Sequence, residues 1–375
     1  MNRDKNIYQD LKWENRNRIF NKIREAGSIS STALTYELQL SRPTVKQNLD
    51  ELLAMGCIFE NGSFGHTGGR RARAYSVVAR SAVAVGIDVT RHHITVILVD
   101  LCGNLFYQKR VRVPFSREDE YLQKLGNLVE EALESEQISG ETVLGVGIAV
   151  PGLITDDHQK VFYGKILDFT GMSAAQFGKY IPFSCRLYND ADSAGYAEVS
   201  RRDDLADAFY ISLSNNVGGS VLIDRKIYKG EGSRSGEVGH MTIVPGGRGC
   251  YCGQKGCLEA YCNAAVLSAC SDGDLDLFFE KLESGDRQCR EVWNEYLQHL
   301  AIAVNNVRML FDCRVILGGY IGAYLEQYLP QLKELAAGRN SFEKNADYIM
   351  ACSVKKEALA LGSALPFIHE YCSAL

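Results

Sequence analysis

Residues 236–260 read GEVGHMTIVPGGRGCYCGQKGCLEA, and this stretch says more about the fold than any other part of the chain. It holds His240, Cys250, Cys252 and Cys257 in the spacing His-x9-Cys-x-Cys-x4-Cys, with glycines that let the backbone turn tightly. Three thiolates and one imidazole form a tetrahedral ligand set suited to zinc, and four protein ligands leave no position for water. The spacing therefore predicts a structural zinc ion. Reduced thiols in a turn, or a redox relay, are the alternative.

Composition excludes several classes of protein. The chain has 375 residues, of which 46% are hydrophobic and 23% charged, as in globular proteins. No apolar run reaches the roughly 18–20 residues of a membrane-spanning helix, and the first ten residues are too polar for a signal peptide. We therefore expect a cytoplasmic protein of two or three domains with no membrane partner. The cysteines outside the zinc motif are expected to be ordinary thiols, because the cytosol keeps thiols reduced.

Charge is distributed unevenly along the chain. Residues 1–80 carry 13 Lys or Arg and 8 Asp or Glu, a net charge of +5. The remaining residues carry 28 basic and 38 acidic side chains, a net charge of −10. A basic segment joined to an acidic body is typical of a nucleic-acid reader attached to a second domain. A solvated basic surface without a partner is the alternative.

Helical periodicity marks three segments in the basic region. Apolar residues recur at helical spacing over 14–26, and a second short helix fits 31–38. A third helix fits 42–55, where Ser41 can cap its start and Gly56 ends it. Three short helices in this arrangement predict a helix-turn-helix.

The outward face of the third helix carries residue types that reach phosphates and base edges in the major groove. These candidate DNA contacts are Arg42, Thr44, Lys46, Gln47 and Asn48. The glycine-rich segment that follows predicts a hairpin, or wing, whose arginines suit the minor groove. These arginines are Arg70, Arg71 and Arg73. A flexible basic linker is the alternative for this stretch.

From residue 81 onward, strands and helices alternate. The expected strands are 82–89, 93–100, 104–113, 143–150, 183–190, 208–214, 217–228 and 314–319. The expected helices are 118–136, 191–200, 257–270 and 288–311. This alternation predicts an α/β fold in two lobes with a cleft between them.

Taken in order, the motifs resemble those of the ROK family, which groups bacterial repressors with sugar kinases. They are the helix-turn-helix, GGRRAR at 68–73, GIDV at 86–89, NDADSA at 189–194, GEVGHM at 236–241 and GCYCGQKGCLEA at 249–260. The resemblance implies a winged helix-turn-helix over 1–80 and an actin-like, sugar-kinase fold over 81–375. The two lobes of that fold would divide near residue 200. The resemblance further implies double-stranded operator DNA and a small sugar as partners, and a homodimer or tetramer.

The resemblance also implies a sugar site. One ring nitrogen of His240 would bind zinc while the other faces a sugar hydroxyl, and Glu237 and Glu259 would accept hydrogen bonds from neighbouring hydroxyls. Asn189 and Asp190 lie where a strand gives way to a helix. In the family's kinases the matching Asp is the catalytic base, but a sensor would keep it equally well to bind sugar. A solvated charge is the alternative for each Glu.

The segments that would hold nucleotide phosphates depart from the kinase pattern. Kinases of the family resemble D-x-G-G-T-K after the first strand, whereas residues 88–93 here read DVTRHH. The second phosphate segment, 214–220, reads SNNVGGS in place of a glycine-rich run. Side chains at these positions would occupy the space where a backbone cradle must approach phosphate. We therefore expect ATP binding to be lost and the chain not to be an enzyme.

The leading interpretation is a sugar-responsive transcriptional regulator that represses carbohydrate-utilisation genes. The first alternative is an ATP-dependent sugar kinase with an added DNA-binding domain, for which Asp190 would be the catalytic residue. The second alternative is a DNA-binding regulator that has lost sugar sensing.

Overall fold

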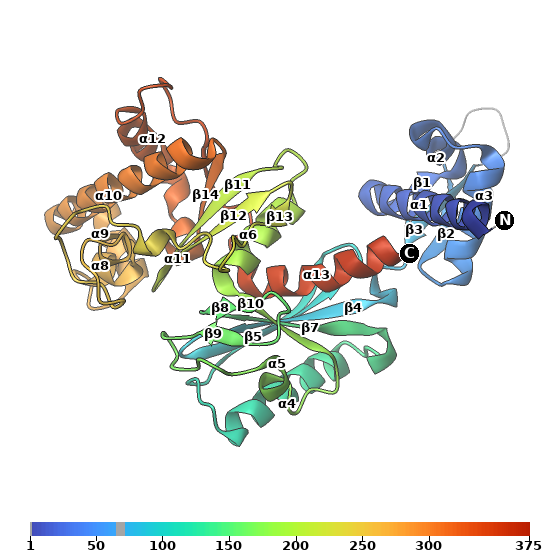
Figure 1. The fold of residues 1–375 in the computed structure, drawn as a ribbon, viewed down its shortest axis with the longest axis horizontal. Coiled ribbons are helices and arrows are strands. Elements are labelled where there is room, and N and C mark those ends of the chain that lie inside the picture. The colour runs from blue at the N-terminus through green and yellow to red at the C-terminus, as the bar shows by residue number, and fades with distance from the viewer. Residues whose placement is uncertain (1, 65–71) are drawn as a thin grey trace.

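The computed structural model describes residues 2–64 and 72–375, and the N-terminal part forms a compact head (Figure 1). Its elements are α1 (Asn2–Ala26), β1 (Ile29–Ser30), α2 (Ser31–Leu38), α3 (Arg42–Ala54), β2 (Ile58–Phe64) and β3 (Ala72–Val77). The strands form a small sheet in the order β1-β3-β2. Helices followed by a β2–β3 hairpin are the arrangement expected of a winged helix-turn-helix.

The local chemistry of the head explains where its helices begin and end. The Ser30 hydroxyl accepts a hydrogen bond from the Ala33 amide at the start of α2, and the Ser41 hydroxyl caps α3 in the same way. Gln39 adopts a left-handed conformation in the turn between the two helices. Helix α1 begins at residue 2, twelve residues before the predicted start. The predicted helix starts late because the sequence of the first three turns shows no apolar stripe.

The body contains two five-stranded sheets with the same plan. The first sheet has the order β10-β7-β4-β5-β6 and the second has the order β13-β12-β11-β14-β15. In each sheet three strands form an antiparallel meander, and two further strands add in parallel on the other side. The first sheet consists of β4 (Val83–Val89), β5 (His93–Asp100), β6 (Leu105–Arg112), β7 (Val143–Val150) and β10 (Cys185–Asn189). The second consists of β11 (Ala208–Leu213), β12 (Val217–Ile223), β13 (Lys226–Ile227), β14 (Arg314–Gly318) and β15 (Ile349–Ala351). This repeated plan is the two-lobed α/β fold that the sequence predicts.

Helices and short elements complete the body. In the first lobe these are α4 (Asp119–Ser135), α5 (Ala174–Phe177) and the hairpin of β8 (Leu153–Ile154) and β9 (Val161–Tyr163). In the second lobe these are α7 (Glu259–Cys262), α8 (Ala264–Ser268), α9 (Leu275–Ser284), α10 (Arg287–Phe311), α11 (Gly319–Gly322) and α12 (Leu329–Ala337). The 3-10 turns are η1 (Ala79–Ser81), η2 (Gly140–Thr142), η3 (Val238–His240) and η4 (Leu325–Tyr328). Helix α6 (Asp190–Ser200) follows β10 directly and packs on both α13 and the second sheet.

The C-terminal helix differs from the expected organisation. The sequence predicts no element beyond residue 319 and a second lobe that runs from 201 to 375. In the structure, α13 (Ala358–Ala374) returns to the first lobe and lies across its sheet. It covers the face opposite α4, and its last turn reaches the head (Figure 1).

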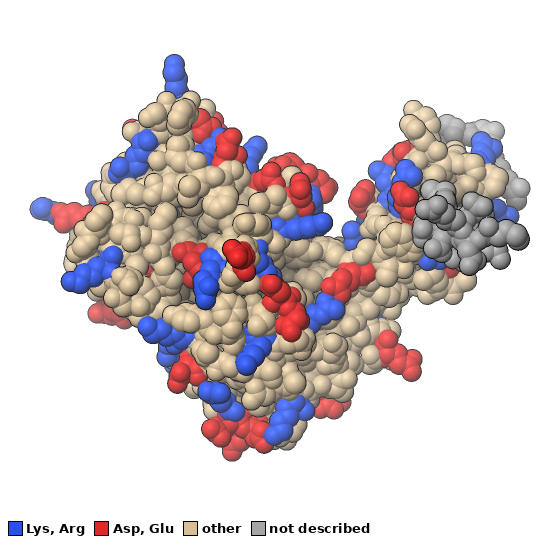
Figure 2. Space-filling view, viewed as in Figure 1, with Lys and Arg blue, Asp and Glu red and all other residues tan. Residues whose placement is uncertain are grey.

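Two further observations describe the molecule as a whole. Among the residues that the structure describes, no helix combines the length and the apolar character that crossing a membrane requires. Charged side chains of both signs are interspersed over the face of the body shown in Figure 2, without a large region of one sign.

Candidate functional site

The His–Cys stretch folds into a tight loop that brings its four predicted metal ligands together. One ligand atom from each of His240, Cys250, Cys252 and Cys257 lies within 4.8 Å of all the others. The Cys252 and Cys257 sulfurs are 3.8 Å apart, and the His240 Nδ1 is 3.8 Å from the Cys250 sulfur. Tetrahedral zinc with bonds of about 2.3 Å to sulfur places its ligands about 3.8 Å apart, so the donor set fits zinc.

The His240 ring links this loop to the cleft. Its Nδ1 faces the cysteines, while its Nε2 lies 3.2 Å from the Tyr251 hydroxyl and 3.9 Å from a carboxylate oxygen of Glu237. Burial, followed by the nearby Lys165, lowers the His240 pKa, which favours the neutral imidazole that binds a metal. The second ring nitrogen of His240 thus meets the Tyr251 hydroxyl in this structure, and its expected contact with a sugar hydroxyl stays a prediction.

Asn189 and Asp190 lie at the junction of β10 and α6. Asn189 caps α6, because its side-chain oxygen accepts a hydrogen bond from the Asp192 amide at 3.0 Å. Its amide group donates to the Gly152 carbonyl at 3.0 Å, which holds the turn after β7 in place. The Asp190 carboxylate accepts a hydrogen bond from the Ala191 amide at 2.9 Å and stands at the start of the helix.

Three carboxylates converge around this junction. Burial raises the pKa of Asp190 to about 6 and that of Asp192 to about 6. Burial also raises the pKa of Glu237 to about 7, and the charges of Asp190 and Asp192 add to the effect. Ser220 donates a hydrogen bond to Asp192 at 2.7 Å. Such carboxylates accept hydrogen bonds from hydroxyl groups, and a bound polyhydroxyl ligand would satisfy them.

The Glu259 carboxylate, predicted to accept hydrogen bonds from sugar hydroxyls, already has partners within the protein. Its side chain is buried, and its two oxygens accept hydrogen bonds from the Val217 amide at 2.5 Å and from the Asn216 side chain at 3.3 Å. Burial raises the Glu259 pKa, and these two partners oppose the rise. Glu259 therefore holds the β11–β12 turn in this structure, and a ligand would have to share its carboxylate with that turn.

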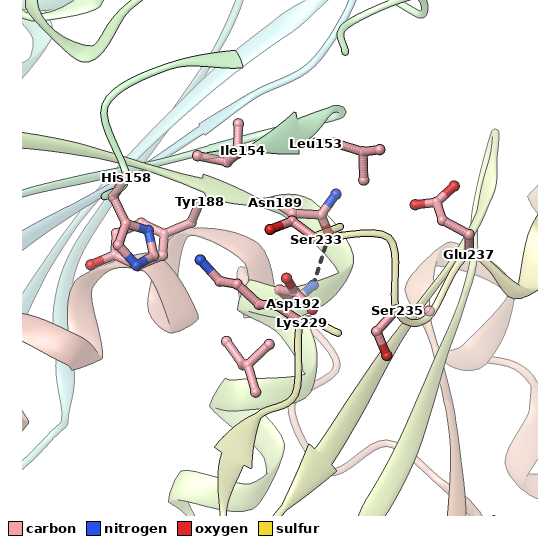
Figure 3. Close-up of a pocket in the computed structure, with 12 residues that line it drawn as sticks. Leu153, Ile154, His158, Tyr188, Asn189, Asp192, Lys229, Ser233, Ser235 and Glu237 are labelled. Carbon is pink, nitrogen blue, oxygen red and sulfur yellow. Dashed lines mark hydrogen bonds between the residues drawn. The ribbon is translucent and has the colours of Figure 1, made fainter. Parts of the chain in front are cut away.

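A cavity between the lobes adds residues that the sequence did not single out. It encloses about 470 Å³ of empty space, its mouth included. Besides Asn189 and Glu237, its polar lining consists of Asp192, Lys229, His158, Tyr188, Ser233 and Ser235. Figure 3 shows Lys229 extending toward His158, with Glu237 on the opposite side of the cavity. Asp192 stands two residues after Asp190 in the same motif and was within reach of sequence reasoning, whereas Lys229 and the serines lie in a loop without a pattern.

The other side of the cleft is built differently. Between β4 and β5 the chain makes a tight turn, in which the Thr90 amide donates to the His93 carbonyl at 3.0 Å. Arg91 and His92 are exposed on this turn, and the Arg91 guanidinium donates to the Ile166 carbonyl at 2.5 Å. Asp88 at the end of β4 is half-buried, and burial raises its pKa to about 7. This turn contains no glycine, the residue type that lets a backbone cradle approach phosphate closely.

Of the six predicted DNA contacts that the structure describes, four are exposed on the head. Arg42, Lys46 and Gln47 are exposed on α3, and Thr44 is half-buried beside the Ser41 cap. Asn48 differs from the expectation: its side chain is 2% exposed and donates to the Thr44 carbonyl at 2.8 Å, inside the same helix. It lies on the buried stripe of α3 and cannot reach a base without unfolding that turn.

The predicted wing is the β2–β3 hairpin. Arg73 is exposed on β3 and pairs with Glu60 across the hairpin, with nitrogen and oxygen 2.7 Å apart. Arg70 and Arg71 lie outside the described residues.

The sequence of the body matches a known protein family. The model described as "ROK family" matches residues 84–369. The chain belongs to the ROK family. The matched residues include both sheets, the cleft and the His–Cys loop, so the family assignment rests on the whole body.

Individual ROK relatives extend the match to the head. The chain is 25% identical over 389 residues to a xylose repressor of Caldicellulosiruptor bescii, covering 97% of both chains. It is 25% identical over 252 residues to an N-acetylglucosamine repressor of Escherichia coli O157:H7, covering 66% of this chain and 62% of the relative. Over most of its length the chain therefore resembles repressors.

Solved ROK structures share the fold to different extents. A ROK family transcriptional regulator, described as a homolog of the E. coli MLC protein, superposes with a TM-score of 0.75 at 20% identity and covers 97% of both chains. A ROK hexokinase from Thermus thermophilus superposes with a TM-score of 0.63 at 24% identity and covers 77% of this chain but 99% of its own. The hexokinase therefore matches about three quarters of this chain, whereas the regulator matches nearly all of it.

Proposed function

We propose that this ROK protein is a transcriptional repressor of carbohydrate-utilisation genes whose affinity for operator DNA responds to a sugar bound between its lobes. The observation that carries the proposal is the near full-length likeness to a xylose repressor, which includes head and body. In this proposal the protein acts in the cytoplasm, where operator DNA is found.

In this proposal the cleft binds the sugar through hydrogen bonds from its hydroxyls. Asn189, Asp190 and Glu237 would contact the ligand directly, and Asp192 and Lys229 would extend the site into the cavity. A polar site of this kind discriminates against ligands that lack a hydroxyl, because its own buried groups would then be left unpaired. Zinc, when bound by His240 and the three cysteines, supplies structural rigidity to the loop that carries His240.

The nucleotide side of the cleft supports a regulator over a kinase. Asp190 has the position of a catalytic base, and this is the observation that favours phosphoryl transfer. Phosphoryl transfer also requires a phosphate cradle, and the turn at 90–92 carries an arginine and a histidine where small residues are needed.

The sugar half of the proposal is tested by ligand-dependent stability. Purified protein is melted with D-xylose, D-glucose and N-acetyl-D-glucosamine in turn. A sugar that binds only the folded state raises the melting temperature, and at 100 times Kd the gain is about 2.7 kcal/mol. No shift with any of these sugars would contradict sensing of these ligands.

The DNA half is tested by selecting bound duplexes from a random library and titrating the selected duplex at several salt concentrations. Lys46→Ala should weaken binding to all sequences and lower the salt slope by about 1, because one phosphate contact is removed. Gln47→Ala should instead relax the selected sequence. Lys22→Ala is the matched control, since Lys22 pairs with Glu37 within the head. Failure to enrich any duplex would contradict DNA binding.

Helix-turn-helix proteins generally bind paired half-sites as symmetric oligomers. We therefore propose a homodimer or tetramer. Light scattering coupled to size exclusion gives the mass directly, and a monomer at the concentrations that bind DNA would contradict this part.

A further inference from the structure

Helix α13 contacts both the first lobe and the head. Most of its length lies against the first sheet and α6, and its last turn lies against α1 (Figure 1). Its fit on the sheet is close, because a Cβ added at Gly147 of β7 would lie 1.9 Å from the Ser363 carbonyl oxygen. The helix backbone is therefore in direct contact with the backbone of β7.

The same helix is packed tightly on α6, which begins at Asp190 in the cleft. A Cβ added at Gly362 would lie 1.7 Å from the carbonyl oxygen of Ser193, within the first turn of α6. No side chain separates the two backbones at this crossing. A movement of the cleft end of α6 is therefore passed on to α13 directly.

Polar contacts continue the link between the two helices. The Tyr196 hydroxyl of α6 lies 2.5 Å from the Nδ1 of His369 on α13. At the far end of α6, the buried Glu198 accepts hydrogen bonds from the Ser353 amide at 3.0 Å and the Val354 amide at 2.6 Å, in the segment that leads into α13. The two helices thus share hydrogen bonds as well as a packed crossing.

At its other end α13 forms the seat of the head. The Asn17 side chain of α1 donates to the Cys372 carbonyl at 2.5 Å, and the neighbouring Arg16 donates to the Leu375 carbonyl. The Cys57 sulfur of the head lies 3.8 Å from the Tyr371 hydroxyl. The apolar core of the head is also continuous with the apolar side of α13. We call these contacts of Arg16, Asn17 and Cys57 with α13 the head seam.

We propose that α13, driven by α6, transmits sugar binding from the cleft to the DNA-binding head, with Asn17 and Arg16 as the positioning residues at the head seam. The inference rests on the proposed function. A sugar held by Asp190 restrains the start of α6, α13 follows α6, and the last turn of α13 resets the angle at which α1 presents α3 to DNA. The zinc loop is not on this route, since within the described residues it exchanges no hydrogen bond with the head.

The test compares two double variants of the full chain. Arg16→Ala with Asn17→Ala removes the two hydrogen bonds that α1 donates to the main-chain oxygens of Cys372 and Leu375. Arg18→Ala with Lys22→Ala is the matched control, because these side chains bond only within the head, to the Leu38 carbonyl and to Glu25 and Glu37. Each protein is titrated with the selected duplex, with and without the sugar that gave the largest melting shift among D-xylose, D-glucose and N-acetyl-D-glucosamine.

The expected result separates coupling from binding. In the wild type and the control, sugar should change the Kd for DNA by about 5–150-fold, the usual range of allosteric coupling. In the seam variant this ratio should fall close to one, while the melting shift with sugar stays at the wild-type value. A seam variant that keeps the wild-type ratio overturns the inference and leaves the proposed function intact. A wild type with a ratio of one for every sugar overturns both.

A second measurement needs no variant. Hydrogen exchange of the wild type should show slower amide exchange in residues 358–374 and in α1 when the same sugar is added. Slower exchange that does not include both residues 358–374 and α1 would overturn the inference. Tyr196→Phe removes one hydroxyl from the middle of the route and should reduce the DNA ratio by less than the seam variant does.

Discussion

The start of α6 and the β4–β5 turn both follow strands of the first sheet, but they carry different chemistry. The proposed sugar side gathers Asp190, Asp192 and Glu237, three carboxylates with raised pKa values. The nucleotide side has exposed Arg91 and His92 on a turn without glycine. In the proposed function, a polyhydroxyl ligand and a phosphate would therefore depend on different residues of the cleft. Four experiments test this difference.

The largest effect is expected from removing a metal ligand on the sugar side. Cys257→Ser leaves three of four ligands and should abolish bound zinc, measured by elemental analysis against about one ion per chain in the wild type. The His240 loop would then lose its anchor and the melting temperature should fall by several degrees, since about 1 kcal/mol corresponds to 2–4 °C in domains of this size. Cys102→Ser, at a turn far from the loop, is the control. Full zinc occupancy in Cys257→Ser would refute the assigned ligand set.

The next effect concerns the ligand itself. Asp190→Asn should lower the affinity for the effective sugar by about 10–150-fold, because hydrogen bonds to charged groups contribute about 1.5–3 kcal/mol. Isothermal titration measures this change. The control is Asp203→Asn, a fully exposed carboxylate in the loop after α6. Equal sugar affinity in Asp190→Asn and wild type would remove Asp190 from the site.

A smaller effect is a change in the pH dependence of stability. The Asp192 pKa is raised by burial from 3.8 to about 6 in the folded state, so the folded state binds the proton more tightly than the unfolded state. As the pH rises from about 4 to about 6, the wild type should therefore lose stability relative to Asp192→Asn. The loss is at most about 3 kcal/mol, at about 1.4 kcal/mol per pKa unit. Melting curves at pH 4, 6 and 8 check this sign, and a difference that does not vary with pH would contradict it.

The smallest expected effect is none at all. ATP with Mg²⁺ should leave the melting temperature unchanged, and a coupled assay should detect no ADP release with hexoses, pentoses or amino sugars, because the phosphate side has no cradle. Sugar-dependent turnover that disappears in Asp190→Asn would erase the distinction between the two sides and restore the kinase interpretation.

Much of the fold and part of the site could be predicted because the signals are local. The four metal ligands fall within 18 residues, so their spacing in the sequence was enough to predict them as one set. Ser41 likewise predicted the start of α3, because a helix cap is a signal between residues close in sequence. Asn48 misled because its polar type favoured the surface, whereas Val45, Leu49 and Leu52 around it define the buried side of the helix.

The elements that were missed depend on partners far away in the sequence. Helix α13 is apolar on nearly all sides because a sheet, α6 and the head surround it, so it has no amphipathic period to detect. Pro366 inside it also argues against a helix in isolation. Lys229 reaches the cavity from a loop, and no periodic signal marks such a position.

The return of α13 to the first lobe also bears on how the protein is made. Chains are synthesised from the N-terminus, and β4, β5 and β7 leave the ribosome long before residues 358–374. Until then one apolar face of the first sheet and the underside of the head have no cover. Contacts between residues more than 350 positions apart, such as Asn17 with Cys372, form slowly because long loops must close first. The nascent chain therefore passes through a stage in which it is prone to aggregation and suited to chaperone binding. This stage ends when α13 docks.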